Sequence, residues 1–263
     1  MAKNTQKSKR RFKAALRAFA DKIADAIAPV EFSCMVCGAE VFDGLGFCNH
    51  CKKSVVYNNG KTCKRCGVGI DGEEDYCGNC MFDKVHFDKS YAVFSYEGAV
   101  QNAILKMKFG NAGRYAKVFA KYLAFLAKKN ELEFDAVTFP PMSAKSKRQR
   151  GYNQSQLMAM YFCELMDCND LLIDALAKVK ETERQEKLNK SERKTNLIGA
   201  YKVQADVKGK RVLVIDDVKT TGATLNECAK ALKKAGAVSV VGLMLSARKE
   251  NFQFEEDAEL NFE

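Results

Sequence analysis

Two adjacent acids and a run of hydroxyl residues stand out in the stretch IDDVKTTGAT, residues 215–224. The apolar run RVLVI before the acids predicts a buried strand, and LNECAKALKKAG after the loop predicts a helix. A loop that enters a helix N-terminus offers free backbone amides and a positive dipole end, which suit a phosphate. Asp216 and Asp217 repel an anion, so we expect them to accept hydrogen bonds from hydroxyl groups or to hold a divalent cation. A sugar phosphate would suit both parts of this stretch, with its phosphate on the loop and its hydroxyl groups on the two acids.

The residues around this loop predict where it begins and ends. We expect the strand to end at Ile215 and the helix to begin near Thr224, because Thr224 and Glu227 have the spacing of a capping box. The stretch lacks the GxxxxGK[ST] pattern of a Walker A loop, and with Gly222 as its single glycine it is not a dinucleotide-binding fingerprint.

The cysteines form the second group of residues with a recognisable chemistry. The chain has eleven cysteines, and eight of them lie in four CxxC pairs that make two copies of one unit. Four thiolates suit a closed tetrahedral zinc site, and an iron–sulfur cluster is the main alternative. Ligation within each copy and ligation between copies are both compatible with the spacing. The predicted metal ligands are Cys34, Cys37, Cys48, Cys51, Cys63, Cys66, Cys77 and Cys80.

The expected role of both zinc sites is structural. A closed site leaves no coordination position open for catalysis, so we expect zinc to stabilise a segment too small to form its own core. Nucleic-acid binding is the alternative, which basic residues around the second and third CxxC pairs favour. These basic residues are Lys52, Lys53, Lys61, Lys64 and Arg65.

The composition favours a protein of the reducing cytoplasm. At 263 residues the chain can form one sizeable domain with an appendage. We find no apolar run long enough to span a membrane, and the basic start does not resemble a signal peptide. Clustered cysteines in such a protein are better explained as metal ligands than as disulfides. The formal charge of +10 would fall to about +6 with two four-thiolate zinc sites, a modest excess that favours phosphate-rich partners.

Strand and helix patterns alternate from Tyr91 onward. Strands are expected in YAVFSY, AVTF, AYKV, RVLVI and VSVVGLML, and helices in GYNQSQLMAMYFCELM and in residues 98–128, with a break near Gly110 and Gly113. This alternation predicts an α/β domain with a mostly parallel sheet that is covered on both faces. The chain then divides into a basic extension at 1–31, a cysteine-rich domain at 32–85, the α/β domain at 90–248 and an acidic tail at 249–263.

The basic extension has apolar residues at helical spacing and is expected to form an amphipathic helix. We expect its apolar stripe to dock on the body of the protein, with nucleic acid or an anionic membrane as the alternative partners.

The stretch IDDVKTTGAT resembles the phosphoribosyl-pyrophosphate signature of type I phosphoribosyltransferases. In those enzymes two acids contact the 2′ and 3′ hydroxyls of the ribose, and the loop after them wraps the 5′-phosphate. The resemblance implies that this donor binds to Asp216, Asp217, Lys219, Thr220, Thr221, Gly222, Ala223 and Thr224.

A second resemblance narrows the family. The segment PPMSAKSKRQRGYNQSQLMA is similar to the RxRGxNQxxLxA signature of the ComF family, which includes GntX-like proteins, and TERQEKLNKSERKTNLIGAY also follows it. The resemblance implies a Rossmann-like type I phosphoribosyltransferase domain preceded by a small double zinc-ribbon domain. The chain departs from the family at Phe139, where a PVP-like turn is usual, and at the basic pair Lys178 and Lys180.

The implied reaction is displacement of pyrophosphate at the anomeric carbon of the donor, which would bind together with Mg²⁺. Basic side chains would stabilise the charge on the leaving pyrophosphate. The candidates for this catalytic role are Arg148, Arg150 and Arg193. A solvated basic face and a clamp on nucleic-acid phosphate are the alternatives for these arginines.

No residue identifies an acceptor, so three functions stay open. The first is a pentosyltransferase with an unidentified acceptor. The second is a non-catalytic factor of DNA uptake in natural transformation, which the ComF resemblance implies, with single-stranded DNA or a DNA-handling protein as its partner. The third is a zinc-stabilised interaction protein with a relic donor site. The sequence predicts no oligomeric state.

Overall fold

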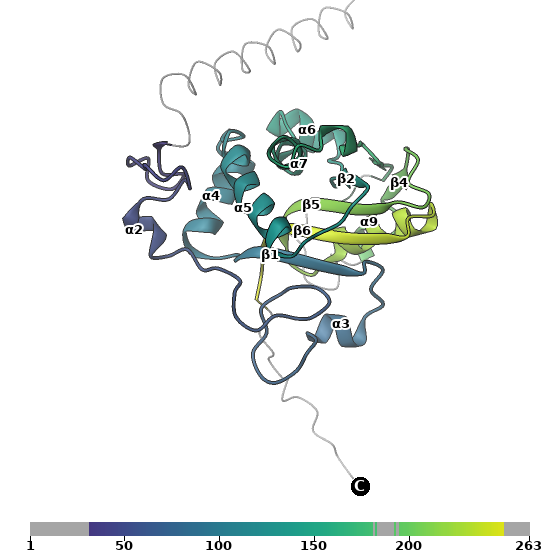
Figure 1. Cartoon of the computed structure of the whole chain (residues 1–263). Coiled ribbons are helices and arrows are strands. Elements are labelled where there is room, and N and C mark those ends of the chain that lie inside the picture. Colours follow the sequence, from purple (N-terminus) through teal and green to yellow (C-terminus); the bar gives the residue numbers. More distant parts are fainter. Residues whose placement is uncertain (1–31, 181, 183–191, 193–194, 250–263) are drawn as a thin grey trace, which may run out of the picture.

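The computed structural model describes residues 32–180, 182, 192 and 195–249 (Figure 1). Within these residues the main sheet has four strands, and every neighbouring pair is parallel. The predicted α/β fold with a parallel sheet is therefore confirmed. In spatial order its strands are β1 (Lys89–Ser95), β6 (Ser239–Ala247), β5 (Arg211–Lys219) and β2 (Ala136–Thr138), and a separate antiparallel pair is formed by β3 (Leu176–Lys178) and β4 (Tyr201–Val203).

Among the described residues, four helices match the predicted pattern and four short ones were not predicted. The expected break between residues 98 and 128 is confirmed, because one helix ends at Phe109 and the next begins at Tyr115. Helix α6 was not predicted because its residues AKSKRQR carry no apolar stripe and are not buried. The helices are α2 (Asn49–Lys52), α3 (Gly78–Phe82), α4 (Gly98–Phe109), α5 (Tyr115–Lys129), α6 (Ala144–Arg150), α7 (Gln154–Leu165), the 3₁₀ helix η2 (Asn169–Leu171) and α9 (Ala223–Lys234).

Both faces of the main sheet are buried. Leu213 and Ile215 of β5 pack with α4, α5 and α7 on one side, which we call the α5 face. Val212 and Val214 pack with α9 on the other side, which we call the α9 face. Successive strand residues point to opposite faces, so a strand buried on both faces has the continuous apolar run that RVLVI shows.

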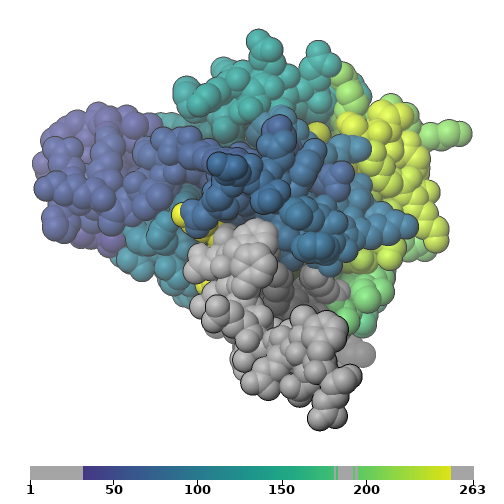
Figure 2. Space-filling view, turned by 90° about the horizontal axis from the view of Figure 1, so that it is seen from below, coloured from purple at the N-terminus to yellow at the C-terminus, as the bar shows by residue number. Residues whose placement is uncertain are grey.

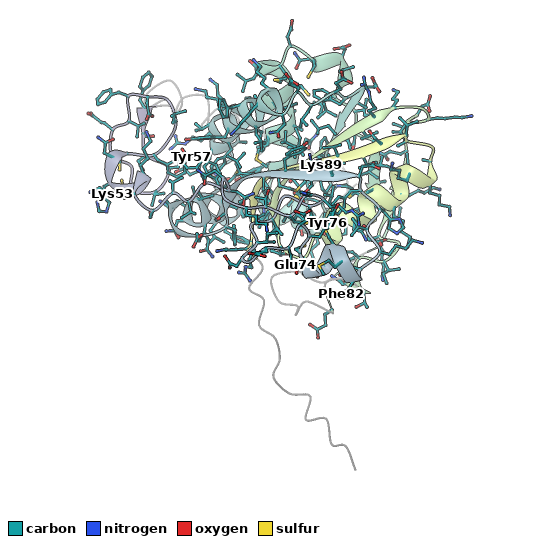
Figure 3. All side chains as sticks on the ribbon, turned by 60° about the horizontal axis from the view of Figure 1, so that its bottom comes forward. Lys53, Tyr57, Glu74, Tyr76, Phe82 and Lys89 are labelled. Atoms are coloured by element: carbon teal, nitrogen blue, oxygen red, sulfur yellow. The ribbon has the colours of Figure 1, made fainter. Side chains whose placement is uncertain are left out.

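The two cysteine units pack on different faces of this sheet. The first cysteine unit (Cys34, Cys37, Cys48 and Cys51) joins the core of the α5 face, and the second cysteine unit (Cys63, Cys66, Cys77 and Cys80) joins the core of the α9 face. Helix α2 of the first unit lies beside α4 in Figure 1, whereas α3 of the second unit lies beyond β1 on the opposite side. The first unit also projects at the left of Figure 2, and Figure 3 places Lys53 far from Tyr76 and Phe82. The two copies share a motif but not a packing environment.

Two boundaries predicted around the hydroxyl loop (residues 219–224) are wrong. Strand β5 does not end at Ile215 but continues to Lys219, because its pairing with β6 extends to Ala247. Helix α9 begins at Ala223 and is preceded by Gly222 in a left-handed conformation with φ of 78°, so Thr224 is not its N-cap. The expected partner of Thr224, Glu227, accepts a hydrogen bond from the Gly199 amide at 3.1 Å instead.

Several predictions concern residues outside the described part of the chain. These are the amphipathic helix at 1–31, the acidic tail beyond Lys249 and Arg193.

Candidate functional site

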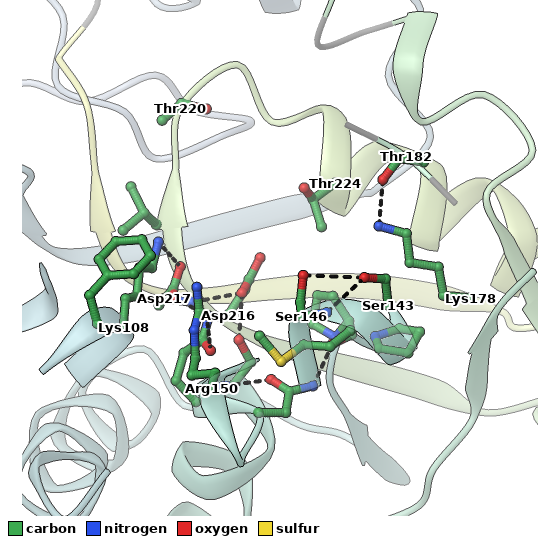
Figure 4. A pocket seen from close by; sticks show the side chains of 18 of the residues that line it. Lys108, Ser143, Ser146, Arg150, Lys178, Thr182, Asp216, Asp217, Thr220 and Thr224 are labelled. Atoms are coloured by element: carbon green, nitrogen blue, oxygen red, sulfur yellow. Dashed lines mark hydrogen bonds and ion pairs between the residues drawn. The ribbon is translucent and has the colours of Figure 1, made fainter. Parts of the chain in front are cut away.

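A cavity of about 670 Å³ opens at the carboxyl ends of β2 and β5, and we call it the central pocket (Figure 4). Its walls come from α4, α6, α7, β5 and the hydroxyl loop, so segments far apart in the sequence meet there. Ligands of parallel α/β sheets commonly bind at this edge. The predicted site residues that line the pocket are Arg150, Asp216, Asp217, Thr220 and Thr224.

Asp217 is buried and has two partners from different helices. The Lys108 Nζ of α4 lies 3.1 Å from Asp217 Oδ1, and the Gln154 Nε2 of α7 donates to Asp217 Oδ2 at 2.6 Å. Burial lowers the pKa of Lys108, but the charges of Asp217 and Asp216 outweigh it and raise the pKa above its ordinary value. Lys108 is therefore a cation that compensates the buried acid.

Asp216 is held by α7 and by its neighbour in the strand. Ser155 Oγ donates to Asp216 Oδ1 at 2.7 Å, and the Asp217 amide donates to the same oxygen at 2.9 Å. Burial, followed by the nearby charge of Asp217, raises the pKa of Asp216 to about 7. Near neutral pH this carboxyl exchanges a proton, and a cation or a hydroxyl donor in the pocket would favour its charged form.

Arg150 is the predicted catalytic arginine that reaches the pocket. Its Nη1 donates to Gln154 Oε1 at 2.6 Å, and its guanidinium lies 5.2 Å from the ring centroid of Phe109. Gln154 thus connects Arg150 to Asp217 through one hydrogen bond to each. Arg148 lies on the exposed side of α6 and does not line the pocket.

Asn153 anchors the start of α7. Its Oδ1 accepts hydrogen bonds from the amides of Ser155 and Gln156, and its Nδ2 donates to the Pro140 carbonyl at 2.9 Å. Asn153 therefore caps α7, and Gln154 takes part in hydrogen bonds within the protein. Both roles keep α7 in register with the ends of β2 and β5.

The hydroxyl loop closes the other side of the pocket. Thr220 and Thr224 line the cavity, whereas Gly222 and Ala223 are buried behind them. In Figure 4 both threonines lie across the open space from Asp216 and Arg150. The loop leads into the twelve-residue helix α9, whose free amides and dipole favour an anion at this end.

Lys178, one of the two departures from the family pattern, forms part of a third wall. Its Nζ donates to Thr182 Oγ1 at 2.6 Å and lies 6.0 Å from the ring centroid of Tyr201. All three side chains line the pocket. The lysine keeps a positive charge there but lacks the planar fork of an arginine.

Each cysteine unit brings its own four sulfurs together, which decides between the two pairings left open by the sequence. Within each unit all Sγ atoms lie within 4.8 Å of one another. The pairs Cys37–Cys48 and Cys66–Cys77 are 3.6 and 3.5 Å apart, close to the sulfur separation of about 3.8 Å around tetrahedral zinc. Both tetrads therefore fit a structural zinc ion.

The two tetrads differ in burial and in the charge beside them. All four cysteines of the second unit are buried, whereas Cys37 of the first unit is exposed. Cys63 raises the pKa of Cys66, but hydrogen bonds from Cys77 and Cys80 together with the charge of Lys219 lower it to about 6. A lysine of the hydroxyl loop thus acts on a ligand of the second site.

Lys108 and Ser155 hold the two acids, although neither was among the predicted site residues. Ser155 follows the Asn-Gln pair directly, so its position beside that motif was a usable signal. No local sequence pattern predicts the contact of Lys108 with Asp217, because this contact depends on how α4 packs against the sheet. Across the described helices, none combines the length and the apolar character needed to cross a membrane.

Comparisons with known proteins match both parts of the chain. Residues 23–81 match a family described as a double zinc ribbon domain, and residues 169–259 match one described as a phosphoribosyl transferase domain. Competence protein F of Haemophilus influenzae is 28% identical over 218 residues, covering 80% of this chain and 94% of that protein.

Two further relatives carry related names. The DNA utilization protein YhgH of Escherichia coli is 26% identical and covers 74% of this chain and 87% of its own length. Competence protein ComFC of Streptococcus pneumoniae is 31% identical, covering 57% of this chain and 64% of that protein. The zinc-ribbon match lies ahead of the parallel α/β fold, and the phosphoribosyl transferase match lies within it. This is the predicted order of the two domains. From these relatives, domains and fold we conclude that the chain belongs to the ComF family, with a phosphoribosyltransferase-type α/β domain preceded by a double zinc ribbon.

Proposed function

We propose that this chain binds phosphoribosyl pyrophosphate with Mg²⁺ in the central pocket and transfers the phosphoribosyl group to an acceptor still to be identified. The observation that carries the proposal is that two acids and two loop hydroxyls line one cavity. The ribose hydroxyls would bind to Asp216 and Asp217. The 5′-phosphate would bind to the hydroxyl loop at the N-terminus of α9.

The pocket residues suit a reaction that depends on position and charge. The bond between the anomeric carbon and the pyrophosphate oxygen would break, and its electron pair would leave with pyrophosphate. A lone pair of the acceptor would form the new bond, and the acceptor proton would pass to solvent. Arg150 is the described arginine that would stabilise the leaving group, and Mg²⁺ would neutralise part of its charge. Roles for Arg148 and Arg193 stay proposals.

The helix contacts to both acids support this proposal because they prepare the site before the donor arrives. Ser155 orients Asp216, and Gln154 and Lys108 orient Asp217. Carboxylates that are already held in place need little reorganisation when the ribose hydroxyls bind.

The first test is calorimetric titration of the zinc-loaded protein with phosphoribosyl pyrophosphate, with and without Mg²⁺. We expect Mg²⁺-dependent binding that is lost in the double variant Asp216→Asn, Asp217→Asn. Absence of binding by the intact protein would overturn the proposal. Pyrophosphate release across a panel of bases and amines then tests whether transfer occurs.

A second candidate function is DNA handling in the cytoplasm without catalysis, supported by the names of the relatives. The exposed basic residues Lys145, Lys147 and Arg148 on α6 lie beside the mouth of the pocket and could bind phosphate backbone. Binding of single-stranded DNA that weakens steeply with salt, and weakens further when all three are changed to alanine, would support it. DNA binding that is unchanged by the triple variant would exclude α6 as the DNA surface.

A further inference from the structure

One face of helix α4 lines the central pocket, and much of its surface is carbon. The face consists of Gln101, Leu105, Lys108 and Phe109, which we call the α4 wall. These residues follow one another at helical spacing, so they project from the same side of the helix. Leu105 is 37% exposed and Phe109 is 55% exposed, although both line a cavity. Their apolar surface is therefore available to a ligand.

The α4 wall lies beside the buried acid of the site. The Lys108 Nζ is 3.1 Å from Asp217 Oδ1, so the charge of this lysine is already compensated. Phe109 is the next residue of the helix, and Leu105 lies about one turn before Lys108. A group that packs on these two side chains is thus next to the acid that the proposed function assigns to the ribose.

The other walls of the pocket carry hydroxyl and cationic groups instead. Ser143 and Ser146 line it at the start of α6, and Lys178 and Thr182 line it on the third wall. In Figure 4 these four side chains lie across the cavity from Lys108. Hydroxyl donors and a cation suit the charged pyrophosphate. The apolar part of the α4 wall suits a less polar group, and the acceptor is the remaining reactant.

Phe109 offers this reactant a flat surface. The Arg150 guanidinium lies 5.2 Å from the ring centroid, and more than half of the residue stays exposed. A planar heterocycle stacks on such a ring and gains contacts that a small aliphatic amine cannot make. The Gln101 side-chain amide, one turn before Leu105, can both donate and accept a hydrogen bond at the polar edge of a heterocycle.

We propose that the α4 wall is the acceptor subsite and that the acceptor is a planar nitrogen heterocycle of the nucleobase class. This inference rests on the proposed function, because the subsite is defined by its place beside the bound ribose. A ring nitrogen forms the new bond to the anomeric carbon with its lone pair. The bond to the pyrophosphate oxygen breaks, its electron pair leaves with pyrophosphate, and the N–H proton of the ring passes to solvent.

The test compares two kinds of probe by calorimetry on the zinc-loaded full chain with Mg²⁺. Ribose 5-phosphate fills the sugar and phosphate positions, and nucleoside 5′-monophosphates add a base to them. The panel contains adenylate, guanylate, cytidylate, uridylate, orotidylate and nicotinate mononucleotide. We expect at least one nucleotide to bind about tenfold more tightly than ribose 5-phosphate, the effect of stacking one ring. This ratio of affinities isolates the contribution of the heterocycle.

Three variants of the α4 wall locate that contribution. We expect Phe109→Ala to reduce the ratio to about twofold, whereas Phe109→Tyr keeps an aromatic ring and should retain most of it. Leu105→Ala should lower the ratio about threefold, because it removes a smaller apolar surface. The matched control is Phe125→Ala on α5, since Phe125 is 67% exposed but does not line the pocket. This control should leave the ratio unchanged.

The possible outcomes separate the acceptor subsite from the proposed function. If phosphoribosyl pyrophosphate binds but no nucleotide binds more tightly than ribose 5-phosphate, the acceptor class is wrong and the donor site stands. A ratio that survives both Phe109→Ala and Leu105→Ala would show that the heterocycle binds away from the α4 wall. If the wild type binds neither phosphoribosyl pyrophosphate nor ribose 5-phosphate, the proposed function fails and the acceptor subsite fails with it.

Discussion

The two cysteine units have the same spacing but support different halves of the central pocket. The first unit packs on α4 and α5, where Tyr122 Oη donates to the Leu45 carbonyl at 2.8 Å. Helix α4 also carries Lys108, the partner of Asp217. The second unit packs on the α9 face and contacts the first turn of α9 through Asn226. The acids are therefore supported from the α5 face, and the hydroxyl loop is supported from the α9 face.

This difference shows that a metal motif specifies its own fold but not its place in a larger structure. The CxxC pairs bring four sulfurs together in both units. The residues between the pairs decide where each unit packs, because the first unit offers Val41 and Phe47 to the α5 face and the second offers Val68 and Ile70 to the α9 face. The four predictions below test this division with variants on one side or the other.

The largest difference is expected between matched glycines of the two units. Gly38 and Gly67 both have left-handed φ values, 79° and 65°, so backbone strain is common to both alanine variants. A Cβ at Gly67 would lie 2.4 Å from the Ser90 carbonyl oxygen, whereas a Cβ at Gly38 meets nothing within 4 Å. We expect Gly67→Ala to lose about 4 kcal/mol and Gly38→Ala about 1 kcal/mol in urea unfolding of the zinc-loaded protein. Equal losses would show that the second unit is not tightly docked.

A somewhat smaller effect is expected from Lys108→Met on the α5 face. The substitution leaves Asp217 buried without its cation, so we expect a loss of about 3 kcal/mol in unfolding free energy. The double variant with Asp217→Asn should recover much of this loss, because it removes the buried charge as well. If the halves are supported separately, Lys108→Met leaves zinc release from the second site at the wild-type rate. Faster zinc release from the second site in Lys108→Met would instead show that the two halves of the pocket depend on each other.

The acid half should also carry a pH dependence of its own. The pKa of Asp216 is about 7 in the folded protein against an ordinary 3.8, so the folded state holds this proton between these values and the unfolded state does not. Stability should therefore fall as pH rises from about 4 to 7, by up to about 1.4 kcal/mol per pH unit from this group. The unfolding free energy of the wild type minus that of Asp216→Asn, followed across this range, isolates the effect. A difference that is flat with pH would contradict the raised pKa.

The smallest effects are expected from single docking hydrogen bonds. Tyr122→Phe removes the bond to Leu45 of the first unit, and Asn226→Ala removes the bonds to the segment after the second unit. Each should lose about 1 to 2 kcal/mol of stability. The informative measurement is chelator-driven zinc release, which we expect to quicken at the first site in Tyr122→Phe and at the second site in Asn226→Ala. The reverse assignment would contradict the packing of the two units.

Much of the fold could be predicted from local patterns. Strand and helix periodicity predicted the parallel α/β domain, and the apolar run RVLVI predicted a strand buried on both faces. The loop boundaries could not be predicted in the same way. Strand β5 extends through two acids because β6 offers backbone partners as far as Ala247, and Glu227 bonds to Gly199 rather than capping α9. Both outcomes depend on residues that are distant in the sequence.

The sequence by itself determined the chemistry of this protein: eight thiolates in CxxC pairs, two acids, and a hydroxyl loop before a helix. Each of these features can be recognised from a short motif, because its chemistry depends on residues within a few positions of one another. Only the tertiary structure decided that Lys108 and Gln154 hold Asp217, that the tetrads form within each copy, and that Asn226 joins α9 to the segment after the second tetrad. The physical reason is that burial and charge compensation depend on which elements pack together, and no local spacing encodes that choice.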